Sequence, residues 1–225
     1  MEPIPPAVAG ELQPSDDAAL LERIRNGDER AFEDLVARYE RRLHRYLRSL
    51  VRDEEKAREL VQDTFFKVYK NAHRFEPRAS FATWLFRIGH NVAVSYLRKK
   101  RIAFVFGLGS HDPESDHPAS DPAWEGLGPH DLAEGAETGR LIREELQRLP
   151  EKLREAFVLF DIEEMSIAEV ARVTGSPEGT IKARIFRARR ALRERLEGYL
   201  KRGDAPAAIA VAVTAGTRNI KATRA

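Results

Sequence analysis

Basic and aromatic side chains are concentrated towards the end of the chain, in a pattern suited to binding nucleic acid. From Lys182 to Arg202 there are nine basic residues and two acidic ones, Glu194 and Glu197, so this segment has a net charge of +7. Cations in such a cluster can bind phosphate groups, and an outward aromatic ring can lie in a DNA groove. The charge run alone favours a plainer interpretation, a salt-bridged helix that faces only water.

The residues around this cluster predict a short helix, a tight turn and a longer basic helix. Ser166 and Glu169 have the spacing of a capping box at the start of the first helix. Gly175 lies in the turn, where glycine can adopt a positive φ. Ser176 can cap the second helix, with Pro177 at its first position, where the missing N–H costs nothing. This order of elements is that of a helix-turn-helix.

The longer helix separates into an apolar face and an outward face. Apolar residues recur at helical spacing and should face the core, namely Ile181, Ile185, Leu192 and Leu196. The opposite side holds Gly179, Ala183, Phe186, Arg187 and Arg190. Small residues followed by an aromatic ring and arginines suit a helix that enters a major groove. Because the cap, the turn and the proline all lie at the positions that a helix-turn-helix requires, we interpret this unit as one that binds DNA and recognises its sequence.

Composition limits the other classes of function. The 225 residues include no cysteine, which excludes disulfides, thiolate zinc sites and a cysteine nucleophile. No nucleophile–base pair or metal cluster is visible, so we predict no catalytic residue, no metal, no cofactor and no enzyme activity. No secretory signal is visible, and the apolar run 207–213 is too short to cross a bilayer. A cytoplasmic protein without membrane insertion is expected.

Two long helices are predicted in the first part of the chain. Helical periodicity begins near Asp17 and continues to Leu50, and Asp53 begins the next helix. Its core face should be Ala57, Val61, Phe65 and Val68. Its outward face holds Glu55, Glu59, Gln62, Asp63 and Lys70, with Phe66 among them. An exposed Phe in this setting is typical of a protein-binding face, but packing of Phe66 against a neighbouring helix fits the pattern equally well.

A third helix follows the proline-containing loop 75–80 and combines aromatic and basic residues. It should bury Phe81, Leu85, Ile88, Val92 and Tyr96. Trp84 lies at the edge of that face, and outward or flanking positions are Thr83, Arg87, His90, Asn91, Val94 and Arg98. The helix ends in Arg98, Lys99, Lys100 and Arg101, which could hold phosphates while aromatics stack on bases. For any single aromatic residue, a place in the core remains the simpler interpretation.

Residues 103–139 contain eight acidic residues and no lysine or arginine, a net charge of −8. Many Gly, Pro and Ser residues accompany them, which predicts a flexible linker. The repeated GLG-x-HD pattern within it follows no strand and opens no helix, so it does not indicate a nucleotide-binding loop.

Region 2 of bacterial sigma factors resembles the stretch DEEKARELVQDTFFKVYKNAHRF followed by SFATWLFRIGHNVAVSYLRKKR. Region 4 resembles Leu149 to Phe157 together with the helix-turn-helix that ends in GTIKARIFRARRAL. The linker has no room for a three-helix region 3. Over about residues 17 to 200, the chain is therefore similar to the two-domain extracytoplasmic-function (ECF) group of sigma factors.

The resemblance implies an all-α fold with two small helical domains. The expected organisation is a disordered segment 1–15, a region 2 bundle 16–102, a flexible acidic linker 103–139, a region 4 helix-turn-helix domain 140–202 and a tail 203–225 without an assigned role. The implied function is to bind core RNA polymerase, recognise the minus-ten and minus-thirty-five promoter elements, and promote melting and initiation. Implied partners are the β′ clamp helices and β flap of the polymerase and promoter DNA. An anti-sigma factor is a further partner that the sequence neither requires nor excludes.

The resemblance also implies roles for individual residues. Those that would bind core polymerase are Glu59, Gln62, Asp63 and Phe66. Those that would bind the minus-ten element are Phe75, Arg78, Ser80, Trp84, Arg87, Asn91, Arg98, Lys99, Lys100 and Arg101. Those that would bind the minus-thirty-five element are Ser176, Thr180, Lys182, Ala183, Phe186, Arg187 and Arg190.

Two other classes of function stay open at this point. One is a stand-alone helix-turn-helix regulator in which residues 17–101 form a dimerisation or sensor domain. The other is an enzyme of helical fold. Transcription with purified core polymerase would separate the first from a sigma factor, because a stand-alone regulator would bind DNA without polymerase.

Overall fold

The computed structural model describes residues 14–75, 80–106 and 136–202, and every regular element in those ranges is helical. Residues 1–13 of the predicted disordered start, Arg78 of the loop, residues 107–135 of the acidic linker and the tail 203–225 lie outside the described residues. Pro14 and Ser15, predicted to be disordered, and residues 136–139, predicted to be linker, are helical. None of the described helices is both long enough and apolar enough to span a membrane.

The first helical stretch is divided by a turn that periodicity did not reveal. Helix α1 covers Pro14–Arg25 and α2 covers Glu29–Val51. Between them Gly27 has a φ of +85°, a left-handed conformation that glycine adopts without steric cost. Asp28 then caps α2, accepting a hydrogen bond from the backbone N–H of Ala31 at 3.2 Å. The predicted continuous pattern was therefore wrong at this turn.

Two further helices complete a bundle with α1 and α2. Helix α3 covers Glu54–Asn71 and is capped by Asp53; a short 3-10 turn, η1 (Ala72–Arg74), follows; and α4 covers Phe81–Val105, capped by Ser80. The apolar faces of α2, α3 and α4 meet in one core. Gly89 permits α4 to approach α2, because a Cβ there would lie 2.8 Å from Leu43 Cδ1. Helix α4 continues to Val105, into the range predicted as linker.

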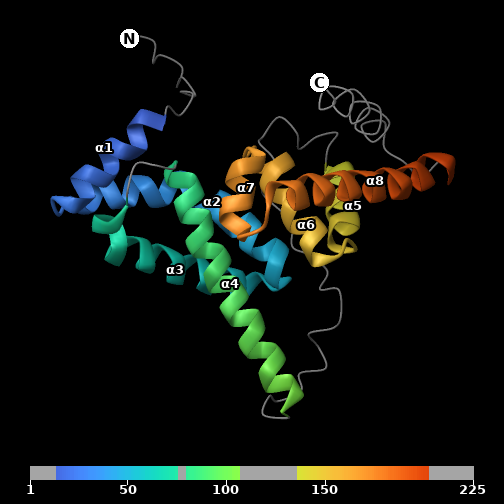
Figure 1. Ribbon diagram of the computed structural model, residues 1–225, viewed down its shortest axis with the longest axis horizontal. Helices are drawn as coiled ribbons and strands as arrows, with labels where there is room; N and C mark the ends of the chain where they lie inside the picture. The colour runs from blue at the N-terminus through green and yellow to red at the C-terminus, as the bar shows by residue number, and fades with distance from the viewer. Residues whose placement is uncertain (1–13, 76–79, 107–135, 203–225) are drawn as a thin grey trace, which may run out of the picture.

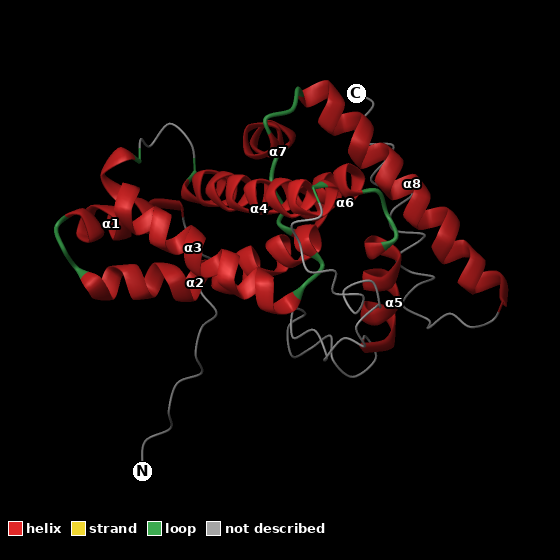
Figure 2. Cartoon of the chain, turned by 90° about the horizontal axis from the view of Figure 1, so that it is seen from below, coloured by secondary structure: helices red, strands yellow, loops and turns green. Residues whose placement is uncertain are grey.

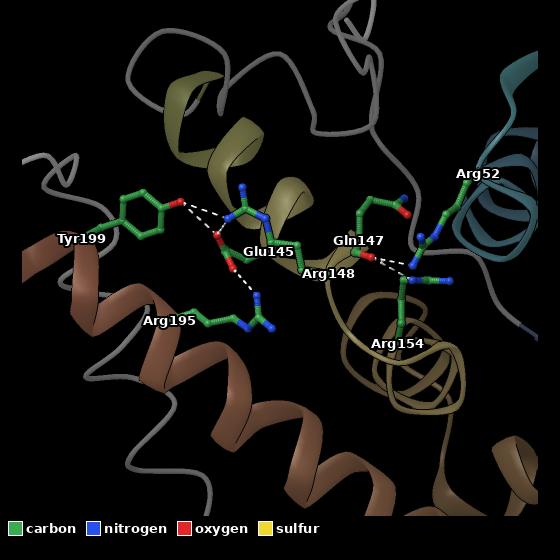
Figure 3. A network of polar contacts seen from close by, with 7 residues as sticks. All are labelled: Arg52, Glu145, Gln147, Arg148, Arg154, Arg195 and Tyr199. Carbon is green, nitrogen blue, oxygen red and sulfur yellow. Dashed lines mark hydrogen bonds and ion pairs between the residues drawn. The ribbon is translucent and has the colours of Figure 1, made fainter. Parts of the chain in front are cut away.

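The described part of the second half contains helices α5 to α8. Helix α5 covers Ala136–Gln147, and α6 covers Glu151–Phe157 and continues as a π-helical turn, η4 (Val158–Ile162). Helix α7 covers Ile167–Thr174 and α8 covers Glu178–Arg202. Buried Glu145 ties α5 to α8, since it accepts hydrogen bonds from Tyr199 Oη at 2.9 Å and Arg195 Nη1 at 3.2 Å (Figure 3).

The two halves pack against each other rather than standing apart. Helix α7 lies against α4 and helix α6 lies against α2 (Figures 1 and 2). Buried residues from both halves belong to one continuous apolar cluster, which includes Leu159, Met165 and Val170 of the second half. In Figure 1 the last turns of α4 extend away from this junction.

This packing corrects two predictions for α4. Thr83 and His90 were expected to be outward or flanking, but they are only 2% and 7% exposed. The second half covers that side of α4: Thr83 Oγ1 bonds to Glu169 of α7 and His90 Nδ1 lies 2.8 Å from Glu155 of α6. Helical periodicity identifies the faces of a helix but not a partner that covers a polar face.

Candidate nucleic-acid and polymerase interfaces

The helix-turn-helix forms with the predicted local contacts. The side chain of Ser166 accepts from the N–H of Glu169 while the Glu169 carboxylate accepts from the N–H of Ser166, so the capping box is present. Gly175 ends α7 with a φ of +64°. Ser176 was expected to cap α8, but α8 begins at Glu178 and the Ser176 hydroxyl accepts a hydrogen bond from Arg184 Nη1 at 3.0 Å.

One face of α8 is exposed and carries most of the residues that the sequence assigned to minus-thirty-five DNA. The opposite face is buried through Ile181, Ile185, Leu192 and Leu196. Phe186 is 54% exposed. Ser176 is half-buried in the preceding turn, and the exposed members of the set are Thr180, Lys182, Ala183, Phe186, Arg187 and Arg190.

The cations of α8 divide into two groups. Arg189 forms a bidentate ion pair with Asp161 and lies 5.2 Å from the Phe160 ring, so it supports the fold. Lys182 and Arg187, by contrast, make no ion pair with any residue that the structure describes. These two cations are therefore available to bind phosphates or base edges.

A shallow groove between α3 and α4 brings together two residues predicted to capture unstacked bases, Trp84 and Asn91. Lys67, Asn71 and Ile88 line it with them, and its volume is about 320 Å³, at the lower end of the range for small-molecule sites. An aromatic face can stack on a base, amides can form hydrogen bonds with the edge of a base, and a cation can bind a phosphate.

Phe75 has a different place from the one expected of a base-contacting residue. It is buried, and its ring lies 5.3 Å from the Trp84 ring and 6.1 Å from that of Phe81. Phe75 therefore supports Trp84 from behind. Ser80 caps α4, and its hydroxyl donates to Glu169 of α7 at 2.9 Å.

The last turns of α4 form an exposed basic surface. Arg87 is exposed on the helix, as are the four consecutive cations at its end, Arg98, Lys99, Lys100 and Arg101. None of the four makes an ion pair within the described part of the chain. The groove and these cations are together the candidate surface for single-stranded DNA.

The outward face of α3 matches the prediction residue by residue. Glu59, Gln62, Asp63 and Phe66 are all exposed, Phe66 by 57%. Lys70 Nζ lies 4.1 Å from the centroid of the Phe66 ring. The alternative interpretation, in which Phe66 packs against a neighbouring helix, is therefore wrong. A large exposed apolar ring beside carboxylates is typical of a protein-binding surface.

Sequence reasoning missed three glutamates of the second half that bind the first half: Glu155, Glu163 and Glu169. Glu155 and Glu163 are 1% and 3% exposed. Their local sequence resembles any charged helix surface, so no pattern in it marks them as buried. The sequence indicates a role for Glu169 alone among the three, as the partner of Ser166 in the capping box.

Comparison with known proteins identifies two family models and several relatives that match this chain. The family model for Sigma-70 region 2 matches residues 35–102, and that for Sigma-70, region 4 matches residues 139–192. The chain is 30% identical over 176 residues to the ECF RNA polymerase sigma factor SigW of Bacillus subtilis, covering 78% of this chain and 94% of the relative. It is 33% identical over 199 residues to the RNA polymerase sigma-H factor of Pseudomonas aeruginosa, covering 84% and 98%.

The chain belongs to the ECF family of RNA polymerase sigma factors. Among solved structures, it resembles the sigma factor RpoE of Bartonella quintana in complex with the anti-sigma factor NepR, with a TM-score of 0.60 and 30% identity over 74% of this chain and 96% of that one. It also resembles CnrH in complex with the cytosolic domain of CnrY, with a TM-score of 0.56 and 29% identity over 81% and 98%.

Family membership decides between the functions left open by the sequence. A stand-alone regulator would need only the helix-turn-helix, whereas both halves of this ECF sigma factor match sigma regions. No catalytic family is indicated, and the described residues contain no group of three His, Asp or Glu side chains that could hold a metal.

Proposed function

We propose that this ECF sigma factor binds core RNA polymerase through α3 and promoter DNA through α4 and α8. The observation that carries this assignment is the presence, on two different halves of one chain, of two surfaces that combine an aromatic side chain with several cations, most of which make no ion pair within the described residues. Two such surfaces suit a promoter with two separate elements.

The exposed face of α8 would read the minus-thirty-five element as duplex. Ala183 and Thr180 let the helix approach the groove closely, and Phe186 offers an apolar contact to a thymine methyl. Lys182 and Arg187 would bind phosphates or guanine edges, because neither has an internal partner. Arg190 also pairs with exposed Glu194 at 2.9 Å, a contact weak enough for DNA to replace.

The groove and the basic end of α4 would hold the melted minus-ten strand. A base that leaves the duplex loses stacking, at a cost of a few kcal/mol, and stacking on Trp84 would offset part of that cost. Asn91 would bond the edge of the base. The cations from Arg98 to Arg101 would hold the adjacent backbone, and Phe75 would keep Trp84 in place.

The outward face of α3 would bind a basic surface of the polymerase. The family resemblance implies that this surface is the β′ clamp helices. Asp63 makes no ion pair within the described residues, so its charge is free to complement a partner. Phe66 would supply the buried apolar anchor at the centre of the contact. Contact of the second half with the β flap follows from the same resemblance.

A regulatory partner and a compartment follow from the same assignment. One solved relative was determined in complex with the anti-sigma factor NepR and another in complex with the cytosolic domain of CnrY, and we propose an anti-sigma factor as a partner here. Promoter DNA and core polymerase would place the protein in the cytoplasm.

Transcription in vitro tests the proposed function. Purified chain and core polymerase would be combined on templates carrying candidate promoters, with core alone as the control. We expect initiation only when both are present, and we expect it to fall when either promoter element is scrambled. Promoter binding by the chain that needs no polymerase and produces no transcript would instead identify a stand-alone regulator.

A further inference from the structure

Helix α1 lies outside the part of the chain that the region 2 family model matches, which begins at residue 35. It nevertheless packs against α2 and against the η1 turn, and it buries Leu20, Leu21 and Ile24. Apolar packing therefore accounts for the place of α1 in the fold. Two of its polar side chains, Asp17 and Arg25, do more than this, because they reach the residues that surround Trp84 in the minus-ten groove, the groove between α3 and α4.

Arg25, in the last turn of α1, forms two hydrogen bonds to the backbone that follows α3. Its Nε donates to the carbonyl oxygen of Ala72 at 3.1 Å, and its Nη2 donates to that of Phe75 at 2.5 Å. Ala72 begins η1 and Phe75 follows it, so one guanidinium bridges the whole turn. Arginine suits this contact because its donors form a rigid planar fork. Carbonyl groups at the C-terminal end of a helix also favour a cation.

The backbone that Arg25 holds carries the ring behind Trp84. Phe75 leaves η1 in an extended conformation, with a φ of −66° and a ψ of 122°, and its N–H donates to the carbonyl oxygen of Ala72 at 3.2 Å. Its ring lies 5.3 Å from the Trp84 ring. Because the rotamers open to a side chain depend on φ and ψ, holding the Phe75 backbone also holds the ring that supports Trp84.

Asp17 provides a second contact from α1 to the same aromatic cluster. It is 9% exposed, and it accepts from Tyr39 Oη at 2.5 Å and pairs with Arg38 Nη1 at 2.6 Å. The Tyr39 ring lies 5.2 Å from that of Phe81, which lies 5.9 Å from that of Trp84. Burial raises the pKa of the Tyr39 hydroxyl, and the hydrogen bond and charge of Asp17 raise it further, so the hydroxyl stays a donor.

We propose that α1 supports the minus-ten groove and that Arg25 is a positioning residue for minus-ten recognition. Arg25 holds the backbone of Phe75, and Asp17 holds the ring of Tyr39, so α1 reaches Trp84 by two routes. A stacking platform that is already in place loses little rotamer freedom when a base binds, which favours binding. The inference rests on the proposed function, in which Trp84 is that platform.

Two plainer roles of Arg25 predict different behaviour. A purely structural residue would, on removal, weaken every activity of the chain together. A direct DNA contact would bind a phosphate, since the side chain is partly exposed, and its loss would reduce the slope of log affinity against log salt concentration by about 0.7. A positioning residue affects the minus-ten strand alone and leaves that slope unchanged, because the number of phosphate contacts stays the same.

Fluorescence of Trp84 tests the positioning without DNA. The chain has two tryptophans, so Trp124→Phe leaves Trp84 as the only one. In this background we expect Arg25→Ala to shift the emission of Trp84 to longer wavelength and to increase its quenching by acrylamide, because the supporting ring is no longer held. Unchanged emission and quenching would overturn the proposal.

The matched control is Arg30→Ala, which removes the same charge from an exposed side chain in the first turn of α2. The Arg30 side chain makes no hydrogen bond or ion pair within the described residues, so the control should leave Trp84 fluorescence unchanged. Far-ultraviolet circular dichroism would establish that the variants fold. Arg25→Lys, which keeps the charge, carries the same comparisons should Arg25→Ala be unfolded.

Binding of a promoter strand tests the effect on recognition. Each variant would be combined with core polymerase and titrated with a fluorescein-labelled single strand, the non-template minus-ten sequence of a promoter on which the parent initiates. Trp84→Ala sets the scale, since loss of one base–aromatic stack weakens binding by about 5- to 150-fold. We expect Arg25→Ala to weaken binding by at least about threefold, a part of that range, and Arg30→Ala to bind like the parent.

The remaining measurements separate the three roles of Arg25. Arg25→Lys should recover only part of the affinity, because an ammonium group cannot bridge two carbonyls as a planar fork does; full recovery would show that charge alone matters and would overturn the proposal. A salt slope reduced by about 0.7 would assign Arg25 to a phosphate instead. An equal loss of affinity for core polymerase and of the response to the minus-thirty-five element would make it purely structural. A parent that initiates on no promoter would refute the proposed function, and Trp84 fluorescence would still judge whether Arg25 positions the ring.

Discussion

Replacing Arg154 with alanine removes the largest fully buried side chain in the described part of the chain. Burial lowers the pKa of its guanidinium to about 10, with nearby Arg52 adding to the effect, so the group is still charged at neutral pH. That charge is offset by three carbonyl acceptors: Ser49 at 2.6 Å, Leu149 at 3.0 Å and Gln147 at 3.1 Å.

The expected loss of stability follows from those contacts. Gln147 keeps a donor, because Arg52 still reaches its carbonyl oxygen. Two buried carbonyls lose theirs, at about 1–3 kcal/mol each, and the vacated space adds a cavity cost. Removal of one member of a buried charged network typically costs about 3–5 kcal/mol, and we expect Arg154→Ala to lie in that range.

Urea unfolding followed by circular dichroism would measure the change in the free energy of unfolding. Arg172→Ala is the control, because Arg172 is exposed on α7 and makes no ion pair within the described residues, and it should stay within about 0.5 kcal/mol. Arg154→Met should fall between the two, since it restores packing but not hydrogen bonds. A loss below about 1 kcal/mol for Arg154→Ala, with an unchanged m-value, would refute the reasoning.

Three further outcomes are expected. Arg187→Ala should weaken use of the minus-thirty-five element by about 1–3 kcal/mol; an equal fall on a template with that element scrambled would contradict this role. Asp63→Lys should weaken binding to core polymerase with unchanged circular dichroism, because it reverses an exposed charge that faces a basic partner surface. Unchanged affinity would show that Asp63 is not part of the interface. Glu155 and Glu169 both have a lowered pKa in the folded chain, so the stability that the two carboxylates contribute is present above the ordinary value of 4.5 and is lost as the pH falls below it. Glu155→Gln should therefore flatten the fall in thermal stability between about pH 5 and 3. An unchanged acid profile would count against a charged Glu155.

Local rules were enough to predict several features of the fold. The capping box of Ser166 formed as expected, because a cap needs only a side chain and an N–H three residues away. The helix predicted to begin at Asp53 begins one residue later, with Asp53 as its cap. The turn at Gly175 followed from the backbone freedom of glycine. The exposed residues of α3 and α8 followed from the helical period, which places them opposite an apolar stripe.

Local rules failed where a side chain had more than one available partner. Ser176 could have capped α8 but instead accepts from Arg184. Phe75 precedes a loop and could have been exposed, but it packs on Phe81 and Trp84. In both cases the neighbouring side chains, brought close by the fold, decided the outcome.

The amino-acid sequence by itself determined the helices, the order of the two sigma regions and the residues that face water on α3 and α8. Tertiary structure alone decided that Thr83 and His90 are buried and that Glu163 pairs with Arg42, which is 121 residues away along the chain. The physical reason is that a helical period fixes the direction of each side chain relative to its own helix, whereas pairing across such a separation depends on how two independently patterned halves come together. A charged residue that faces outward from its own helix is exposed or buried according to what packs against it.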